Sequence, residues 1–166
     1  KYKSAFCKVI FYKNQLIVKP TFEEEQRFTQ GWIWVLLIGI TLIPLSKLYF
    51  QTESESADRI GYYIFFILML KLMAVFWLLK LKTTIDEVSI KVHFVPFINK
   101  TFYWEDIKTA QVLNYGFVGG WGIRLWTKYG TVYNVKGNKG LVLELESGEK
   151  YCIGTQKEDE LREFIK

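Results

Sequence analysis

The sequence has few of the residues from which metal and redox sites are built: one histidine, two cysteines and two methionines among 166 residues. His93 is the single histidine, so a zinc site made of paired histidines and cysteines has nothing to draw on. Cys7 and Cys152 lie far apart and have neither metal-ligand nor redox spacing, so we expect two free thiols in a reducing compartment. The sequence therefore predicts a protein without a metal or another cofactor.

Residue patterns typical of catalysis are also missing. No motif places a serine or cysteine near His93, and Glu105 and Asp106 are neighbours on a predicted strand, so their carboxylates point to opposite faces. Residues 137–140 (GNKG) lack the Lys-Ser or Lys-Thr of a phosphate loop and predict a turn with positive φ. We expect a protein that is not an enzyme, and no small-molecule substrate is identified. Catalytic groups that converge from separate strands are the alternative that the sequence leaves open.

Apolar residues, by contrast, are abundant at 50% of the chain, and two long runs hold many of them. The runs cover residues 31–49 and 60–81, with a polar loop at 50–59. Because a helix needs about 20 mostly apolar residues to cross a bilayer, each run predicts a membrane span. We expect a transmembrane helical hairpin over 30–82, kinked near Pro44.

The distribution of charge predicts the orientation of this hairpin. Basic residues precede the first run and close the second, whereas the loop is mainly acidic. The positive-inside rule then places both termini in the cytoplasm, as in a multi-pass protein of the cell inner (cytoplasmic) membrane. An anionic bilayer explains the net charge of +5 better than nucleic acid does, so no nucleic-acid partner is expected. The basic residues that flank the hairpin are Lys1, Lys3, Lys8, Lys13, Lys19, Arg27, Lys80 and Lys82, and the charged residues of the loop are Glu53, Glu55, Asp58 and Arg59.

Lys71 lies midway along the second apolar run. A lysine at the bilayer centre costs about 3 kcal/mol on insertion scales. Two interpretations stay open: a polar contact with another subunit or an ion pathway, and snorkelling or pairing with a lipid phosphate. Because the first run holds no acidic residue, a partner carboxylate would have to come from another chain.

The segment before the first run, residues 1–29, is expected to hold a β-hairpin and a juxtamembrane lead. Residues 6–12 and 16–19 have strand character, with a turn at 13–15. Thr21 followed by Glu24 is a capping-box pattern, which predicts a short helix over 21–27.

From residue 83 to residue 166 the chain changes to short alternating segments, which predict six or seven strands. Turns are expected at residues 86–87, 99–100 and 147–149, and a C-terminal helix begins after Thr155, with Glu158 completing a capping box. The fold class expected for the whole chain is an α+β membrane protein, in which a small antiparallel barrel or sandwich is closed by the last helix.

Four segments of this region form a recognisable set: 102–107 (FYWEDI), 119–124 (GGWGIR), 133–140 (YNVKGNKG) and 153–156 (IGTQ). Together they resemble the bacterial pleckstrin-homology-like (bacterial PH) domains of small membrane proteins. The resemblance covers about 83–166 and implies a PH-like fold after membrane helices. Better-known PH domains bind phosphoinositides through a basic loop, which here offers only Asn99 and Lys100.

Residues 119–124 are the best candidate for specific binding. Their glycines would let a partner approach, with Trp121 stacked and Arg124 paired to a carboxylate or phosphate. The alternative is a β-bulge with Trp121 in the core and Arg124 capping a buried carbonyl. The candidate binding residues are Lys71, Trp121, Arg124, Asn138 and Lys139.

Together these patterns predict a non-catalytic, membrane-anchored PH-like interaction or accessory module. Its expected partners are the lipid bilayer, anionic headgroups, and a membrane protein or further copies of itself. The alternative is a component of an oligomeric transporter or channel that uses Lys71.

Overall fold

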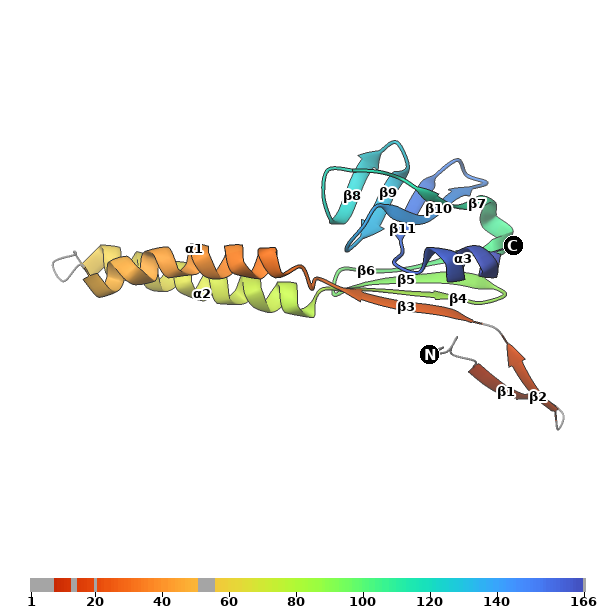
Figure 1. Ribbon diagram of the computed structural model, residues 1–166, viewed down its shortest axis with the longest axis horizontal. Helices are drawn as coiled ribbons and strands as arrows, with labels where there is room; N and C mark the ends of the chain where they lie inside the picture. Colours follow the sequence, from red (N-terminus) through yellow and green to blue (C-terminus); the bar gives the residue numbers. More distant parts are fainter. Residues whose placement is uncertain (1–7, 13–14, 20, 51–55, 166) are drawn as a thin grey trace. The chain divides into compact units, whose positions relative to one another are not determined.

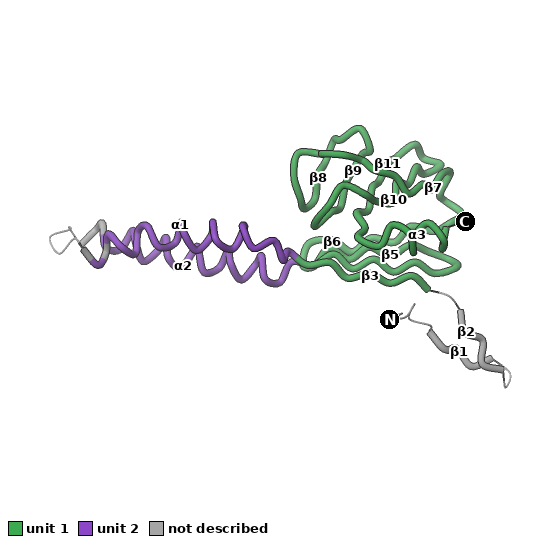
Figure 2. The backbone as a smooth tube through the Cα atoms, in the orientation of Figure 1, with its two compact units in different colours: residues 1–27, 80–166 green, residues 28–79 purple. Residues whose placement is uncertain are grey.

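A computed structural model describes residues 8–12, 15–19, 21–50 and 56–165. The chain is α+β and divides into two compact units, which Figure 2 distinguishes by colour. One unit is residues 28–79, and the other combines 1–27 with 80–166. We call them the helical unit and the β unit.

The helical unit is a hairpin of α1 (Gly31–Phe50) and α2 (Ser56–Leu78). At its base the Phe28 ring meets the Phe76 ring edge-on at 5.8 Å, and Trp34 Nε1 donates to the Phe28 carbonyl. In the described part of the chain one helix, over Arg59–Leu78, is long and apolar enough to cross a membrane; the apolar part of α1, Gly31–Lys47, is shorter.

The first sheet of the β unit has the strand order β3-β4-β5-β6, with every neighbouring pair antiparallel. Alternate residues of β3, β4 and β5 are buried, as expected for a sheet with one face in a core, whereas Phe102 is the buried residue of β6. The strands are β3 (Phe22–Arg27), β4 (Lys80–Ile85), β5 (Ser89–Val95) and β6 (Ile98–Tyr103).

The second sheet has the order β7-β10-β11-β9-β8, so β7 and β8 are its edges. The pair of β11 and β9 is parallel, and the other pairs are antiparallel. A 3₁₀ turn, η1 (Trp104–Asp106), leads into this sheet from β6. The strands are β7 (Ile107–Asn114), β8 (Gly122–Thr127), β9 (Gly130–Asn134), β10 (Lys139–Leu145) and β11 (Lys150–Gly154).

The two sheets form separate layers, and α3 (Glu158–Ile165) lies at one end between them (Figure 1). This helix contacts β7 of one sheet and β3 of the other. Leu161 of this helix is buried, and the Phe164 ring, also on the helix, lies 6.4 Å from the Phe22 ring of β3. The helix therefore closes the gap between two edge strands.

The N-terminal hairpin consists of β1 (Lys8–Tyr12) and β2 (Gln15–Lys19), which pair antiparallel. The hairpin expected from the sequence is thereby confirmed, although residues 13–14 of its turn lie outside the described residues.

The prediction of a helix over 21–27 is wrong, because these residues form β3 and pair with β4. The strand was hidden from sequence reasoning because two of its three inward residues, Glu24 and Gln26, are polar. Since β4 already begins at Lys80, the β unit starts earlier than the expected boundary at residue 83.

Two further expectations need correction. The turn predicted at Asn99-Lys100 lies inside β6, and the chain turns instead at Pro96-Phe97, after a cis Val95–Pro96 bond. The sheets are not purely antiparallel, because β9 and β11 are parallel, and no closed barrel is found in the described ranges.

Candidate functional site

A glycine-rich loop, residues 115–121, leads into the edge strand β8. Its base is fixed by Tyr115, which is buried, donates its backbone N–H to the Asn138 carbonyl and donates its hydroxyl to the Gly137 carbonyl at 3.3 Å. Asn134 Nδ2 donates to the Tyr115 hydroxyl at 3.2 Å and to the Gly120 carbonyl at 3.4 Å. Burial raises the pKa of Tyr115, so it stays a neutral donor. The buried side chains of Tyr115 and Asn134 thus fix the conformation of this loop, which its glycines alone would leave free to vary.

Arg124, on β8, folds back against this loop. A side chain at Gly120 would meet Arg124 Nη2 at 2.5 Å, which explains the glycine there together with its φ of +122°. Arg124 Nε is buried without a hydrogen-bond partner among the described residues. Trp121 lies at the surface, 36% exposed. The structure therefore brings Trp121 and Arg124 onto one loop–strand segment, but does not place Trp121 in the core.

The β-bulge lies further along β8 than the glycines suggested. Arg124 pairs with Val132 and Thr127 with Gly130, so Leu125 and Trp126 together face only Thr131. Trp126 takes a φ of +54°, a left-handed conformation unusual for a tryptophan, and is 96% exposed. We call six residues of this segment the β8 surface, namely the exposed Phe117, Trp121, Leu125, Trp126 and Lys128 together with the partly buried Arg124.

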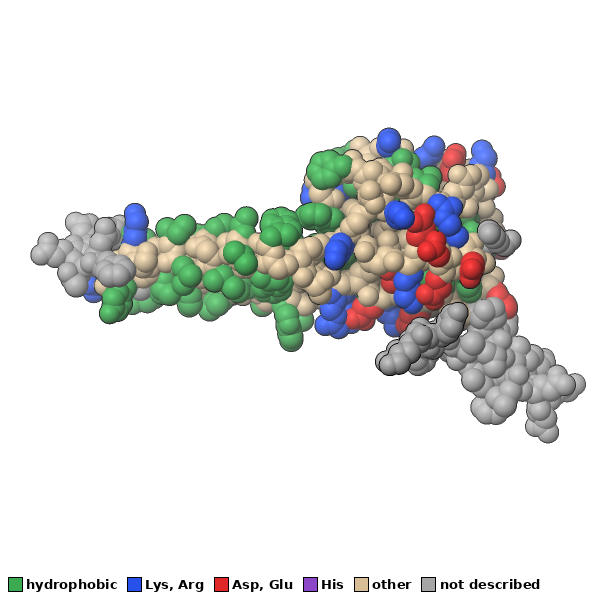
Figure 3. Space-filling view, viewed as in Figure 1, with side chains coloured by type: hydrophobic (Ala, Val, Ile, Leu, Met, Phe, Trp, Pro, Cys, Tyr) green, Lys and Arg blue, Asp and Glu red, His purple; other side chains and the backbone are tan. Residues whose placement is uncertain are grey.

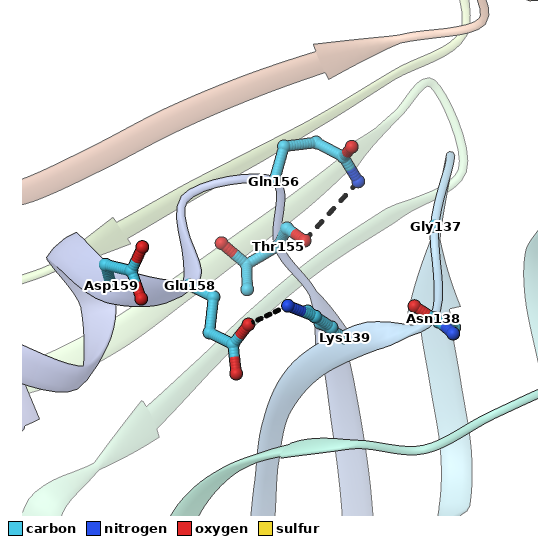
Figure 4. A pocket seen from close by; sticks show the side chains of 7 residues that line it. All are labelled: Gly137, Asn138, Lys139, Thr155, Gln156, Glu158 and Asp159. Atoms are coloured by element: carbon cyan, nitrogen blue, oxygen red, sulfur yellow. Dashed lines mark hydrogen bonds and ion pairs between the residues drawn. The ribbon is translucent and has the colours of Figure 1, made fainter.

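Asn138 and Lys139 lie elsewhere, at an open hollow of about 240 Å³ beside the start of α3 (Figure 4). Lys139 forms an ion pair with Glu158, and this pairing, together with Arg162, holds the pKa of Glu158 below its usual range. The charge of Lys139 is therefore already matched. The hollow is polar, with these lining residues: Gly137, Asn138, Lys139, Thr155, Gln156, Glu158 and Asp159.

No protein-family model and no curated protein matches this chain.

Lys71 lies on α2, in the helical unit, and its side chain is exposed. The ion pairs found in the described ranges do not include it. The five candidate residues thus fall into three places: Trp121 with Arg124, Asn138 with Lys139, and Lys71 alone.

The chain also has a buried carboxylate that sequence reasoning missed. Glu24, on β3, is 5% exposed, and it accepts hydrogen bonds from the Thr155 hydroxyl at 2.6 Å and from the Gln156 backbone N–H at 2.7 Å. Burial raises the pKa of Glu24 above its usual range. Next along the strand's inward face, Gln26 Nε2 donates to the Gly154 carbonyl at 2.7 Å. These contacts join β3 to the segment that enters α3.

The same contacts replace the capping box predicted for α3. The Thr155 hydroxyl is directed to Glu24, and its oxygen accepts the Lys157 backbone N–H at 3.0 Å. Glu158 is used by Lys139 and Arg162, and the Thr155 N–H is donated to the Lys139 carbonyl. The predicted cap is therefore wrong, because partners distant in sequence take both of its residues.

Chemically reactive groups are sparse in the described part of the chain. Cys152 is a free, fully buried thiol, and burial raises its pKa to about 12, which keeps it protonated and unreactive. Cys7 lies outside the described residues. Within the described ranges, no group of three His, Cys, Asp or Glu residues is placed to hold a metal ion.

Proposed function

We propose that this chain is a membrane-anchored, non-catalytic interaction or accessory module. The helical unit would be the anchor, with both chain termini on the cytoplasmic side. The β unit would be a PH-like domain that binds partner membrane proteins or anionic lipid headgroups.

The observation that carries this proposal is the outer surface of the helical unit. Figure 3 shows it covered by hydrophobic side chains, and most of the large apolar residues of α1 and α2 are exposed. Each such side chain costs about 1.5–3 kcal/mol when it is left in water rather than buried. A hairpin with this surface needs hydrocarbon or apolar protein around it.

Support for the PH-like assignment of the β unit is architectural. It has two sheets in two layers and a C-terminal helix that closes one end by contacts with β3 and β7. The sequence resemblance falls on the same region. Fold likeness alone does not assign a ligand, so the binding role depends on surfaces rather than on architecture.

The test is the behaviour of the full chain in its native membrane. We expect it to stay with the membrane fraction after washes with high salt and with alkaline carbonate, which remove proteins held only by charge or by surface contacts. Extraction in mild detergent should then yield copies of the chain or a larger membrane complex, measured by size-exclusion chromatography with light scattering. Release by carbonate would refute the anchor, and a strictly monomeric, partner-free chain would refute the interaction role.

Lys71 supports a second candidate, a subunit of an oligomeric transporter or channel. An exposed lysine within an apolar helix is costly in lipid and marks ion or proton pathways in membrane proteins. Replacement of Lys71 by Leu distinguishes the two functions. Lost ion flux with assembly intact would favour transport, whereas unchanged flux and assembly would exclude the transport function.

A further inference from the structure

The β8 surface exposes large aromatic side chains at a cost that the fold does not recover. Trp126 is 96% and Phe117 87% exposed, so neither ring stabilises the core. Trp126 also holds a left-handed backbone conformation, which disfavours any residue with a Cβ atom. Backbone strain of this kind gathers at functional positions, because local stability alone would select glycine or asparagine there.

The architecture of this sheet edge directs these residues outward. β8 pairs only with β9, and its bulge leaves Leu125 and Trp126 outside the regular ladder. Phe117 lies on the glycine loop at the other end of the strand, while the next residue, Val118, packs on the core. Exposed apolar side chains therefore lie at both ends of β8, with Phe117 and Trp121 in the loop before it and Leu125 and Trp126 at the bulge.

The charged residues of β8 and of the loops at its two ends have one sign. Between Tyr115 and Gly130 the chain holds Arg124 and Lys128 and no acidic residue. Arg124 precedes Leu125, and Lys128 follows Trp126 after Thr127. On the face that Figure 3 shows, hydrophobic side chains gather over β8 and acidic side chains lie away from it. The other basic residues nearby in sequence do not add to this edge in the same way, since Lys108 lies on β7 at the opposite edge and Lys139 is paired with Glu158.

Aromatic rings between cations match the headgroup layer of an anionic bilayer. Tryptophan rings prefer the depth where apolar chains meet water, and each lysine or arginine near an anionic surface gains about 1 kcal/mol. A protein partner would have to supply both acidic groups and an apolar groove. An anionic bilayer supplies negatively charged headgroups and an apolar interior along its whole surface.

We infer that the β8 surface inserts Trp126, Leu125 and Phe117 into the headgroup layer of an anionic membrane, with Lys128 on lipid phosphates. The inference rests on the proposed function, since the helical unit is what would hold the β unit beside a bilayer. It assigns the lipid contact to an edge strand rather than to the Asn99-Lys100 segment.

The experiment places an environment-sensitive fluorophore on Leu125→Cys in the full chain, reconstituted at one chain per nanodisc. The background carries Cys7→Ser, and Cys152 is buried and protonated, so the label goes to one site. Discs contain phosphatidylcholine with or without phosphatidylglycerol, and a headgroup spin-labelled lipid serves as quencher. The matched control carries the label on Ser147→Cys, in the exposed β10–β11 turn.

We expect the label at position 125 to emit at shorter wavelength in the anionic discs, and to be quenched several-fold more strongly than the label at 147. Trp126→Ser, and separately Lys128→Gln, should reduce both effects, and discs of phosphatidylcholine alone should weaken them. A label at 125 that behaves like the label at 147 would overturn the inference.

Two further outcomes separate this inference from its alternatives. A wavelength shift that occurs only in discs with several chains would assign the surface to a second copy and overturn the lipid contact. Retention of the chain in the disc reports on the helical unit independently. A chain that co-elutes with the disc while the label stays in water therefore refutes this inference and leaves the anchor intact.

Discussion

Glu24 shows how a residue far from any expected site can determine the structure around it. Its carboxylate accepts two hydrogen bonds from the segment that enters α3, and both donors would be unsatisfied without it. A buried donor left without a partner costs more than an average hydrogen bond gains. The acidic side chain on the inner face of β3 therefore has a structural role as a hydrogen-bond acceptor.

Replacement of Glu24 by Ala should destabilise the β unit by about 1–3 kcal/mol, because it leaves the buried Thr155 hydroxyl and the partly buried Gln156 N–H without their acceptor. The measurement is thermal or chemical unfolding of the full chain in detergent, followed by near-UV circular dichroism. Glu23→Ala is the matched control, since Glu23 makes a surface ion pair with Lys82 and should cost less than about 1 kcal/mol. Equal losses in the two variants would contradict the assigned role.

Glu24 should also make stability depend on pH in an unusual direction. Burial raises its pKa, with Lys157 opposing and Glu160 adding to the shift, so the folded chain holds this proton to higher pH than the unfolded chain does. Stability from this group is complete below the unfolded pKa and is lost as pH rises through the folded pKa. As pH rises from about 4, near the ordinary pKa of a glutamate in the unfolded chain, wild type should therefore lose melting temperature relative to Glu24→Gln. A difference between the two proteins that stays constant as pH rises would refute the shift.

Trp126 offers a test of stored backbone strain. Trp126→Gly should stabilise the β unit in detergent by about 1 kcal/mol, because glycine adopts a φ of +54° without the Cβ clash. Leu125→Gly is the control: Leu125 is not among the residues with positive φ, so glycine there should destabilise by about 0.5–1 kcal/mol. Unfolding midpoints that move in the same direction for both variants would show that the bulge is not strained.

At the scale of elements, the sequence predicted those whose residues follow one pattern throughout. The helices α1 and α2 are continuous apolar runs, so each was found close to its actual bounds, and β5 has the alternation from which strands were predicted in this region. The turn at 147–149 follows from residues that favour turns. The strand predicted through Glu105 and Asp106 is wrong, because both residues lie in the 3₁₀ turn η1. Local patterns suffice where local and tertiary preferences agree.

The elements that were missed depend on distant partners. β3 is a strand because β4 pairs with it across the intervening helical unit, and its inward Glu24 and the Nε2 of Gln26 bond to residues at 154–156. The parallel pairing of β9 with β11 leaves no local signal either. Of the candidate site, Trp121 and Arg124 were selected from composition, whereas the bulge at Trp126 depends on a register that the sequence does not state.

The parallel pair of β9 and β11 depends on one close approach. A side chain at Gly130 would run into the Lys150 carbonyl, and Gly130 has a φ of +72°. Gly130→Ala should therefore cost more than the roughly 1–2 kcal/mol of left-handed strain alone. Gly148→Ala is the matched control, because Gly148 has a similar φ of +84° but open space around it. Chemical denaturation should rank the two clearly, and equal losses would show that β11 can move away freely.

At the scale of the whole molecule, the helical unit is an insertion into a β unit that is continuous in space. Residues 1–27 and 80–166 form one compact unit, and Arg27 pairs with Lys80 at the point where the chain leaves and returns. A domain drawn from residue 83 onward would lack β3 and half of β4. Glu24 and Gln26 would be missing too, so the entry to α3 would lose its partners.

The register of β3 and β4 predicts that residues 28–79 can be replaced by an Asn-Gly turn. Arg27 and Lys80 are directly paired across antiparallel strands, and a two-residue turn of this type closes such a hairpin without strain. The resulting protein should be soluble without detergent and should unfold cooperatively, as measured by sedimentation and by thermal melting. Residues 83–166 alone are the comparison, and should fail to show a cooperative transition. If that shorter fragment were as stable as the joined protein, β3 would be dispensable; if the joined protein failed to fold, the β unit would depend on the helical insertion.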